Sequence, residues 1–577
     1  MATAPDRADS LWQSIRCPGL SANHASLIPI VDALRKETAV FAHKNSQPPG
    51  LLWVVFLGGT GVGKSTCFNA VCGETVSATG VERPKTSGPI VYVHQRWMDV
   101  LEKRFPFPSQ RFVRQVPNDA CWSPTSGLAH QVQMVAHERE SFAHLALVDT
   151  PDLDSVAVQN RQMAEDLYLL ADAVVFVSSQ EKYADQVPFR FLERIRRDRK
   201  LSFLLLNKAE PQLSRAEILS TLQDLGSPAA DERLFLLPAT PLDPARFLQQ
   251  NPEFLAFAAD FHQALPPGEA SRLAREERRR FSLALANKLD AALAVLQEEA
   301  QSTDQWLTLL DGLLEKTVHQ LLDRQQGQVD EESRRHLQAE VRKIFTKYDL
   351  LAKPRRLIGQ ILLGPLRFLG IIPEERTDSY HVALQRLHQK IDLQPIEMAI
   401  EAFNRQVLEN LSPADEAAPL FDAMRKPGVP LDPAEIKKTV WKEQDQLVKW
   451  LEETFQKLAQ GIPRTTKWGI YTTSIVWGVV LLALEVMVGG GISLAQAVLD
   501  SAVAPFLTKG AVELFASSEL QKLVRTLADR YRRSLAEVVH EQQRRYAGLL
   551  EELSTSPEVL ATLRAKRDEY LAGGVTP

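Results

Sequence analysis

The pattern of apolar and polar positions differs between the two halves of the chain. In the first half, short continuous apolar runs are separated by polar or helical stretches. Such runs are typical of strands buried on both faces of a parallel sheet, and their alternation with helices predicts a doubly wound α/β domain. The runs are Leu51–Leu57, Pro89–Val93, Leu145–Val148, Ala173–Val177, Phe203–Leu206 and Leu234–Leu237. We expect this domain to end near Pro266–Gly268.

Helical spacing of apolar residues dominates the second half. From Ala270 to about Leu350 the sequence is charged, and its apolar residues fall on one helical stripe. Similar patterns occupy Val382–Leu411, Ala434–Leu458 and Leu520–Leu553, and Ser21–Lys44 near the N-terminus shows one as well. Long amphipathic helices bury their stripes by pairing with one another. The second half is therefore predicted to be an all-α helical bundle.

Two apolar segments interrupt the helical half. Leu357–Pro373 is rich in Gly and Pro, and Trp468–Val488 has the length of about 20 residues that crosses a bilayer. Basic residues flank the second segment, namely Arg464, Lys467 and Lys509. Glu485 inside it would cost roughly 2 to 3 kcal/mol or more near the bilayer centre. The segment can therefore touch, enter or cross a membrane, and the alternative is a buried central helix.

Composition and charge narrow the class of protein. The 577 residues are 45% hydrophobic and 24% charged, which is ordinary for folded proteins, and the formal net charge is -5. This charge does not predict a uniformly basic surface, although it allows local basic patches, and no nucleic-acid partner is expected. The four cysteines match neither a zinc site nor a disulfide framework, and the N-terminal residues show no signal peptide. These features favour reduced thiols and a cytoplasmic protein.

A glycine-rich motif directly follows the first predicted strand. It fits GxxxxGK[ST] and consists of Gly58, Gly59, Thr60, Gly61, Val62, Gly63, Lys64 and Ser65, with Thr66 opening the following helical sequence. The glycines allow backbone N–H groups to wrap a phosphate, and the helix N-terminus adds its positive end. Lys64 is expected to reach the β- and γ-phosphates, and Ser65 to bind Mg²⁺. The motif predicts a P-loop nucleotide site.

An acidic residue ends another predicted strand. Asp149 follows the run Leu145–Val148 and begins the sequence Asp-Thr-Pro-Asp. A carboxylate at this strand end could simply be solvated. Together with the P-loop, it is expected to hold Mg²⁺ directly or through a water molecule.

The order of motifs resembles that of a known family. Three motifs, in this order, resemble those of TRAFAC-class P-loop GTPases: the P-loop, Asp-Thr-Pro-Asp and Asn207-Lys208-Ala209-Glu210. The resemblance is to the dynamin-like and Era-like branches in particular, including bacterial dynamin-like proteins. The resemblance implies GTP or GDP with Mg²⁺ as ligands. It also implies that Asn207, Lys208 and Glu210 bind guanine, and that Ala239 and Thr240 form the last base loop. By the same resemblance Thr86 is the switch threonine, with metal-binding and catalytic roles beside Lys64.

Two residues depart from the family pattern. Asp152 replaces the glycine of DxxG, and its carboxylate would repel the γ-phosphate unless it turned away. Glu210 replaces the aspartate of NKxD, which keeps the carboxylate but moves it by one methylene. Leu153 occupies the position at which Ras-type GTPases carry a water-orienting glutamine. Dynamin-like and Era-like proteins also have an apolar residue at this position. Slow intrinsic hydrolysis is therefore expected. The resemblance to the family implies that G domains pair in a homodimer or oligomer.

These features divide the chain into five parts. An N-terminal helix (1–49) is expected to pack on the helical region, and the GTPase domain covers 50–266. A helical bundle (267–465), an apolar segment that is a possible membrane tip (466–515) and a returning C-terminal helix (516–577) follow.

The leading hypothesis is a dynamin-like GTPase that couples GTP hydrolysis to conformational change at the cytoplasmic face of a membrane, with lipid as a partner. The alternative is a nucleotide-switched binding protein that turns over slowly and recruits a protein partner. A membrane-bound scaffold with a degenerate site is a third hypothesis, and the intact P-loop argues against it.

Overall fold

The structure is a computed structural model in which two compact units form from interleaved parts of the chain. It describes residues 10–47, 50–79, 88–103, 111–115, 131–154, 158–179, 186–210, 212, 214–224, 233–239, 244–327, 393–460 and 511–573. One unit contains 1–13, 26–294 and 557–577, and the other contains 14–25 and 295–556. Helix α10 (Ala270–Gly327) contributes to both units.

The first unit is built on an eight-stranded sheet. Its order is β3-β4-β2-β5-β1-β6-β7-β8, and each described pair is parallel except β2 with β5. The strands are β1 (Leu52–Gly58), β2 (Ile90–His94), β3 (Arg111–Gln115), β4 (Gln131–His137), β5 (Leu145–Asp149), β6 (Ala173–Ser179), β7 (Leu201–Ala209) and β8 (Leu234–Pro238). Because β1 lies between β5 and β6, the loop after it is placed at the middle of the sheet.

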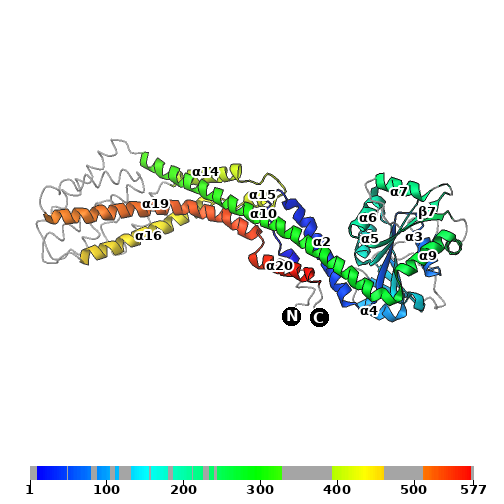
Figure 1. Cartoon of the computed structure of the whole chain (residues 1–577). Helices are drawn as coiled ribbons and strands as arrows, with labels where there is room; N and C mark the ends of the chain where they lie inside the picture. The colour runs from blue at the N-terminus through cyan, green and yellow to red at the C-terminus, as the bar shows by residue number, and fades with distance from the viewer. Residues whose placement is uncertain are drawn as a thin grey trace. The chain divides into compact units, whose positions relative to one another are not determined.

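Helices cover both faces of this sheet (Figure 1). An apolar core lies on each face of the sheet, and successive residues of β1 point to opposite faces. Trp53 and Val55 belong to one core, and Val54 and Phe56 belong to the other. The helices of the unit are α2 (Leu27–Ser46), α3 (Lys64–Cys72), α4 (Met98–Lys103), α5 (Val158–Leu170), α6 (Gln186–Arg197), α7 (Arg215–Asp224), α8 (Pro244–Leu248), α9 (Pro252–Ala264), the start of α10 and α20 (Pro557–Leu571). Strands shielded on both sides explain the continuous apolar runs of the sequence.

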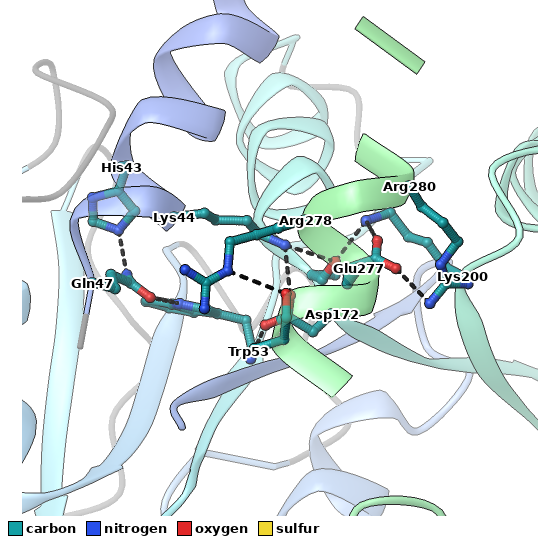
Figure 2. A network of polar contacts seen from close by, with 11 residues as sticks. His43, Lys44, Gln47, Trp53, Asp172, Lys200, Glu277, Arg278 and Arg280 are labelled. Carbon is teal, nitrogen blue, oxygen red and sulfur yellow. Dashed lines mark hydrogen bonds and ion pairs between the residues drawn. The ribbon is translucent and has the colours of Figure 1, made fainter. Parts of the chain in front are cut away.

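A buried polar network attaches α2 and α10 to the base of the sheet (Figure 2). Lys44 of α2 pairs with Asp172 at 2.7 Å, and the other carboxylate oxygen of Asp172 accepts the main-chain N–H of Trp53 at 2.8 Å. Lys200 pairs with Glu277 of α10 at 3.2 Å. Burial lowers the pKa of Lys200, and Glu277 opposes this shift. Charges removed from water require such partners.

The second unit is helical. Its described elements are the rest of α10, α14 (Gln394–Asn410), α15 (Pro419–Met424), α16 (Pro433–Gln460) and α19 (Ala511–Leu553). One apolar core joins them, with Leu310, Phe403, Val440 and Leu535 as members from four of the helices. Each helix contributes residues three or four positions apart, as expected of amphipathic helices in a bundle.

The predicted fold class is confirmed: a P-loop α/β domain with a mostly parallel, doubly wound sheet is joined to an all-α bundle. The predicted strand runs coincide with β1, β2, β5, β6, β7 and β8. None of the described helices is long and apolar enough to cross a membrane. The two apolar segments, 357–373 and 468–488, lie outside the described residues.

Candidate nucleotide-binding site

The P-loop joins the central strand β1 to helix α3. Gly61 and Gly63 have φ values of 71° and 89°, in the left-handed region that favours glycine. A Cβ atom at Gly63 would lie 2.2 Å from Nδ2 of Asn207, and one at Gly58 would lie 2.3 Å from the carbonyl oxygen of Val177. Glycine is therefore required at these positions by backbone conformation or by close packing.

Lys64 lies inside the loop as a buried cation. Its side chain is 3% exposed, and its Nζ lies 3.5 Å from Oδ1 of Asp149 and 3.3 Å from Oδ1 of Asp152. Burial lowers the pKa of Lys64, but the two carboxylates outweigh it, so the pKa lies above its ordinary value. The ammonium is therefore charged at neutral pH, as the binding of phosphate requires.

Ser65 and Asp149 converge beside Lys64. The Ser65 hydroxyl donates to Oδ2 of Asp149 at 2.7 Å. Oδ1 of Asp149 is buried and receives no hydrogen bond from the described residues. A hydroxyl and a carboxylate are the hard oxygen ligands that Mg²⁺ prefers, and Mg²⁺ in nucleotide sites completes its shell with waters and phosphate oxygens. The residues present therefore fit a magnesium ion.

Ser77 is a member of this cluster that sequence analysis missed. Its hydroxyl donates to Oδ2 of Asp149 at 2.8 Å, and its side chain is fully buried. Asn69 of α3 holds Ser77 in place, because its Oδ1 accepts the N–H of Ser77 at 2.8 Å and its Nδ2 donates to the carbonyl of Ser77 at 2.7 Å. The signal for this arrangement is the single amide, Asn69, among the buried apolar residues of α3.

The end of β7 contacts the other side of the P-loop. Asn207 donates from Nδ2 to the carbonyl oxygen of Val62 at 2.8 Å, and Lys208 donates from Nζ to the carbonyl of Gly61 at 2.8 Å. Lys208 has φ of 57°, next to an irregular register between Leu206 and Ala209. The backbone irregularity at the strand end thus accompanies the turn of Lys208 toward the P-loop.

The remaining predicted residues are placed as follows. Glu210 is exposed after β7 and accepts a hydrogen bond from Gln212, and Ala239 is exposed at the end of neighbouring β8. Thr66 is half-buried on α3. Thr86 and Thr240 lie outside the described residues. The structure thus brings the P-loop, Asp149, Asn207 and Lys208 together, and the binding roles of all these residues stay predictions.

Comparisons with known proteins give structural matches alone. No protein-family model matches the sequence, and no curated protein matches it. Two solved structures, each described as an oligomerised bacterial dynamin pair providing a mechanism for long-range sensing and tethering of membranes, align with 99% and 100% of this chain and 96% of theirs. Their sequence identities are 10% and 11%, and their TM-scores 0.35 and 0.36.

A third match is to Era in complex with MgGDPNP and nucleotides of 16S ribosomal RNA. It covers 41% of this chain and 68% of that one, at 16% identity and a TM-score of 0.24. The two groups of proteins that the motifs resemble are therefore both among the structural matches. TM-scores this low carry nothing about activity, substrate or partners.

Proposed function

We propose that this chain is a GTPase that binds GTP with Mg²⁺ on the P-loop and hydrolyses it to GDP and phosphate. The observation that carries the proposal is the convergence of Lys64, Ser65 and Asp149 at the N-terminus of α3, with Ser65 and Asp149 in direct hydrogen-bond contact. An ammonium, a hydroxyl and a carboxylate around a glycine loop form the set of groups that binds a magnesium–triphosphate complex.

Each residue has a distinct role in this proposal. Lys64 neutralises charge on the β- and γ-phosphates, and Ser65 and Asp149 hold Mg²⁺ directly or through water. Magnesium supplies further neutralisation of the charge that develops on the transferred phosphoryl group. Thr86 is proposed to complete the metal site and to help hold the attacking water. Leu153 offers no polar group for that water, so turnover by a single molecule is expected to be slow.

Replacing the P-loop lysine tests the site. Lys64→Ala should abolish binding of a fluorescent GTP analogue in a chain that stays folded, as judged by circular dichroism. The buried carboxylates of Asp149 and Asp152 lose their cation in this variant, so Lys64→Met, which preserves side-chain bulk, serves as a second form. Unchanged nucleotide affinity in either folded variant would contradict the assignment of the P-loop as the nucleotide-binding site.

Guanine preference is proposed for the end of β7. Asn207, Lys208 and Glu210 are expected to bind the base edge, and a site built to hydrogen-bond one base leaves buried groups unpaired with another. GTP should therefore compete much better than ATP for the site. Equal competition by the two nucleotides would leave a general nucleoside triphosphatase.

Coupling to a membrane is the wider part of the proposal. Its support is the apolar sequence Trp468–Val488, flanked by basic residues that suit anionic head groups. We propose that G domains pair in a homodimer or oligomer and that the helical half contacts lipid at the cytoplasmic face of a membrane. Co-sedimentation with anionic liposomes, and turnover per molecule that rises with protein concentration, are the expected results. Neither effect would be seen if the apolar segment is core and the chain acts alone.

A nucleotide-switched binding protein is the second candidate. It is favoured by the contact of Asp152 with Lys64 and by the burial of Leu153, both beside the phosphate-binding groups. Such a protein would bind GTP, hydrolyse it slowly at every protein concentration, and recruit a partner through its helices. The concentration dependence of turnover distinguishes the two candidates.

A further inference from the structure

The three residues that follow Pro151 contact the P-loop one after another. Oδ1 of Asp152 lies 3.3 Å from Nζ of Lys64. The N–H of Leu153 donates to the carbonyl of Gly58 at 3.1 Å. Oδ1 of Asp154 accepts both the main-chain N–H and the hydroxyl of Thr60, each at 2.6 Å. The segment Asp152–Asp154 is thus held on the loop at its first glycine, at its middle and at its lysine.

Two of these contacts occupy groups that a phosphate would use. A P-loop binds phosphate through its main-chain N–H groups and through its lysine. Asp154 takes the N–H of Thr60, and Asp152 takes the ammonium of Lys64. Carboxylate and phosphate oxygens are both anionic acceptors, so each can replace the other at such donors.

The fit of Asp154 depends on a glycine. A Cβ atom at Gly59 would lie 3.0 Å from Oδ2 of Asp154, which is closer than nearly all real contacts of this kind. Leu153 between the two acids is buried, with 4% of its surface exposed. Leu153 belongs to one apolar core of the sheet unit, so the segment is anchored by an apolar side chain as well as by charge.

Charge makes this arrangement sensitive to the number of phosphates. Lys64 already faces two carboxylates, and the side chain of Asp152 is only 14% exposed, so solvent screens its charge weakly. Main-chain N–H groups of a P-loop hold the α- and β-phosphates, whereas the lysine reaches the β- and γ-phosphates. A γ-phosphate therefore adds negative charge beside Asp152, and a diphosphate adds less.

We propose that Asp152, held in place by Leu153 and Asp154, is a built-in competitor of the γ-phosphate, which a nucleoside triphosphate must displace from Lys64, so that the resting site favours a diphosphate. The proposal rests on the proposed nucleotide-binding function and adds a preference to it. Only molecules in which the segment has moved away bind triphosphate. The apparent affinity is therefore the intrinsic affinity multiplied by the fraction of molecules in that state.

Paired affinities for a fluorescent diphosphate and a non-hydrolysable triphosphate test the proposal. In Asp152→Asn, which preserves shape and removes the charge, the triphosphate should bind about tenfold more tightly and the diphosphate less than about threefold more tightly. Glu102→Gln, an equivalent change at an exposed position of α4, should alter neither affinity. Equal changes for the two nucleotides in Asp152→Asn would indicate a general charge effect and overturn the proposal.

Hydrogen exchange gives a second measurement on the unmutated chain. The amide protons of Thr60 and Leu153 should be protected without nucleotide, and that of Leu153 should lose protection on adding triphosphate but keep it with diphosphate. Protection of Leu153 that is identical with both nucleotides contradicts the proposal. If neither the wild type nor Asp152→Asn binds nucleotide, the proposed function itself is refuted. If both bind nucleotide with the same affinities, only the proposed competition between Asp152 and the γ-phosphate is refuted.

Discussion

Asn207 donates a hydrogen bond from its side-chain amide to the main-chain carbonyl of Val62 at 2.8 Å, and this contact ties the end of β7 to the P-loop. The side chain is 5% exposed, so the bond lies out of water. One residue thereby belongs to two parts of the predicted site, the phosphate loop and the base pocket. Its removal should disturb both.

Asn207→Ala is therefore expected to weaken binding of GDP and GTP alike. The loss of one buried hydrogen bond and one base contact corresponds to a decrease in affinity of about tenfold or more. Fluorescence titration of both nucleotides measures it. Asn410→Ala, at an exposed amide of α14 that donates to the carbonyl of Gln406 in its own helix, is the control and should bind as the wild type does. Retention of full affinity in Asn207→Ala would contradict the placement of the base pocket.

Gly63 provides a sharper steric test of the same contact. An alanine there would have to adopt φ near 89° and would place its Cβ 2.2 Å from Nδ2 of Asn207. The left-handed conformation alone costs about 1 to 2 kcal/mol for a residue with a Cβ. We expect Gly63→Ala to lose nucleotide binding while the sheet stays folded, as judged by circular dichroism. Gly312→Ala on α10, where a Cβ meets nothing within 4 Å, should bind nucleotide normally.

The elements that sequence analysis predicted are those with strong local signals. Strands β1, β5 and β6 are buried on both faces, so their sequences are continuous apolar runs. The P-loop is identified by the spacing of its glycines and lysine. Strands β3 and β4 were not predicted. β3 (Arg111–Gln115) carries three polar residues among five and lies at the sheet edge, so its pattern resembles that of a loop.

The contacts that sequence analysis missed join residues far apart in the chain. Ser77 meets Asp149 across 72 positions, and Lys44 meets Asp172 across 128. Periodicity reports the face on which a residue lies, whereas the partner it meets there depends on how the strands are ordered. The roles of Thr86 and Thr240, and the five-part division of the chain, stay predictions.

Lys44 should be needed for the stability of the sheet unit. Lys44→Met removes the cation and leaves Asp172 buried, still accepting the N–H of Trp53 but without its salt-bridge partner from α2. Breaking one side of a buried ion pair costs about 3 kcal/mol or more. Native-state hydrogen exchange of β1 amides should accelerate by about a hundredfold, since each 1.4 kcal/mol corresponds to a factor of about ten.

The control for Lys44 is an exposed ion pair on α10, the helix that carries Glu277 of the same buried network. Arg272 pairs with Glu276 at 2.7 Å, and each side chain is about half exposed. Arg272→Met should leave the exchange of β1 unchanged, because exposed pairs stabilise little. If Lys44→Met exchanges at the same rate as Arg272→Met, the buried network does not hold α2 on the sheet.

Glu299 should hold the N-terminal segment within the helical unit. Its carboxylate is buried and accepts the main-chain N–H groups of Gly19, Leu20 and Ser21 at 3.2, 3.2 and 2.6 Å. Glu299→Ala leaves these donors unpaired, at about 1 to 3 kcal/mol for each that stays buried. We expect residues 14–25 to become sensitive to limited proteolysis. Glu298→Ala, which removes one exposed contact to Asn23, should leave the cleavage pattern unchanged.

His137 should make the stability of the sheet unit depend on pH. It is 5% exposed, stacks on Tyr92 with ring centroids 4.2 Å apart, and its Nδ1 accepts the N–H of Arg139 at 3.2 Å. Burial, with His94 and Arg139 nearby, lowers the pKa of His137 from 6.5 to about 4. An Nδ1 that accepts a hydrogen bond cannot carry a proton, so protonation also breaks the contact with Arg139.

The sign of the effect follows from this lowered pKa. Between about pH 6.5 and pH 4 the unfolded chain binds a proton at this histidine and the folded chain does not, so stability is complete above this range and falls as the pH falls through it. From about pH 7.5 to about pH 5 we expect the wild type to lose about 2 kcal/mol more than His137→Phe, which preserves the stacking ring.

Urea denaturation at a series of pH values measures this difference. His144 and His262 also have lowered pKa values, but both are present in the wild type and in the variant, so their contributions cancel. His319→Gln, at a side chain that is 79% exposed, should follow the wild type at every pH. Parallel stability curves for the wild type and His137→Phe would show that His137 takes up its proton equally well in the folded and the unfolded chain, and that burial between β2 and β4 does not keep it neutral.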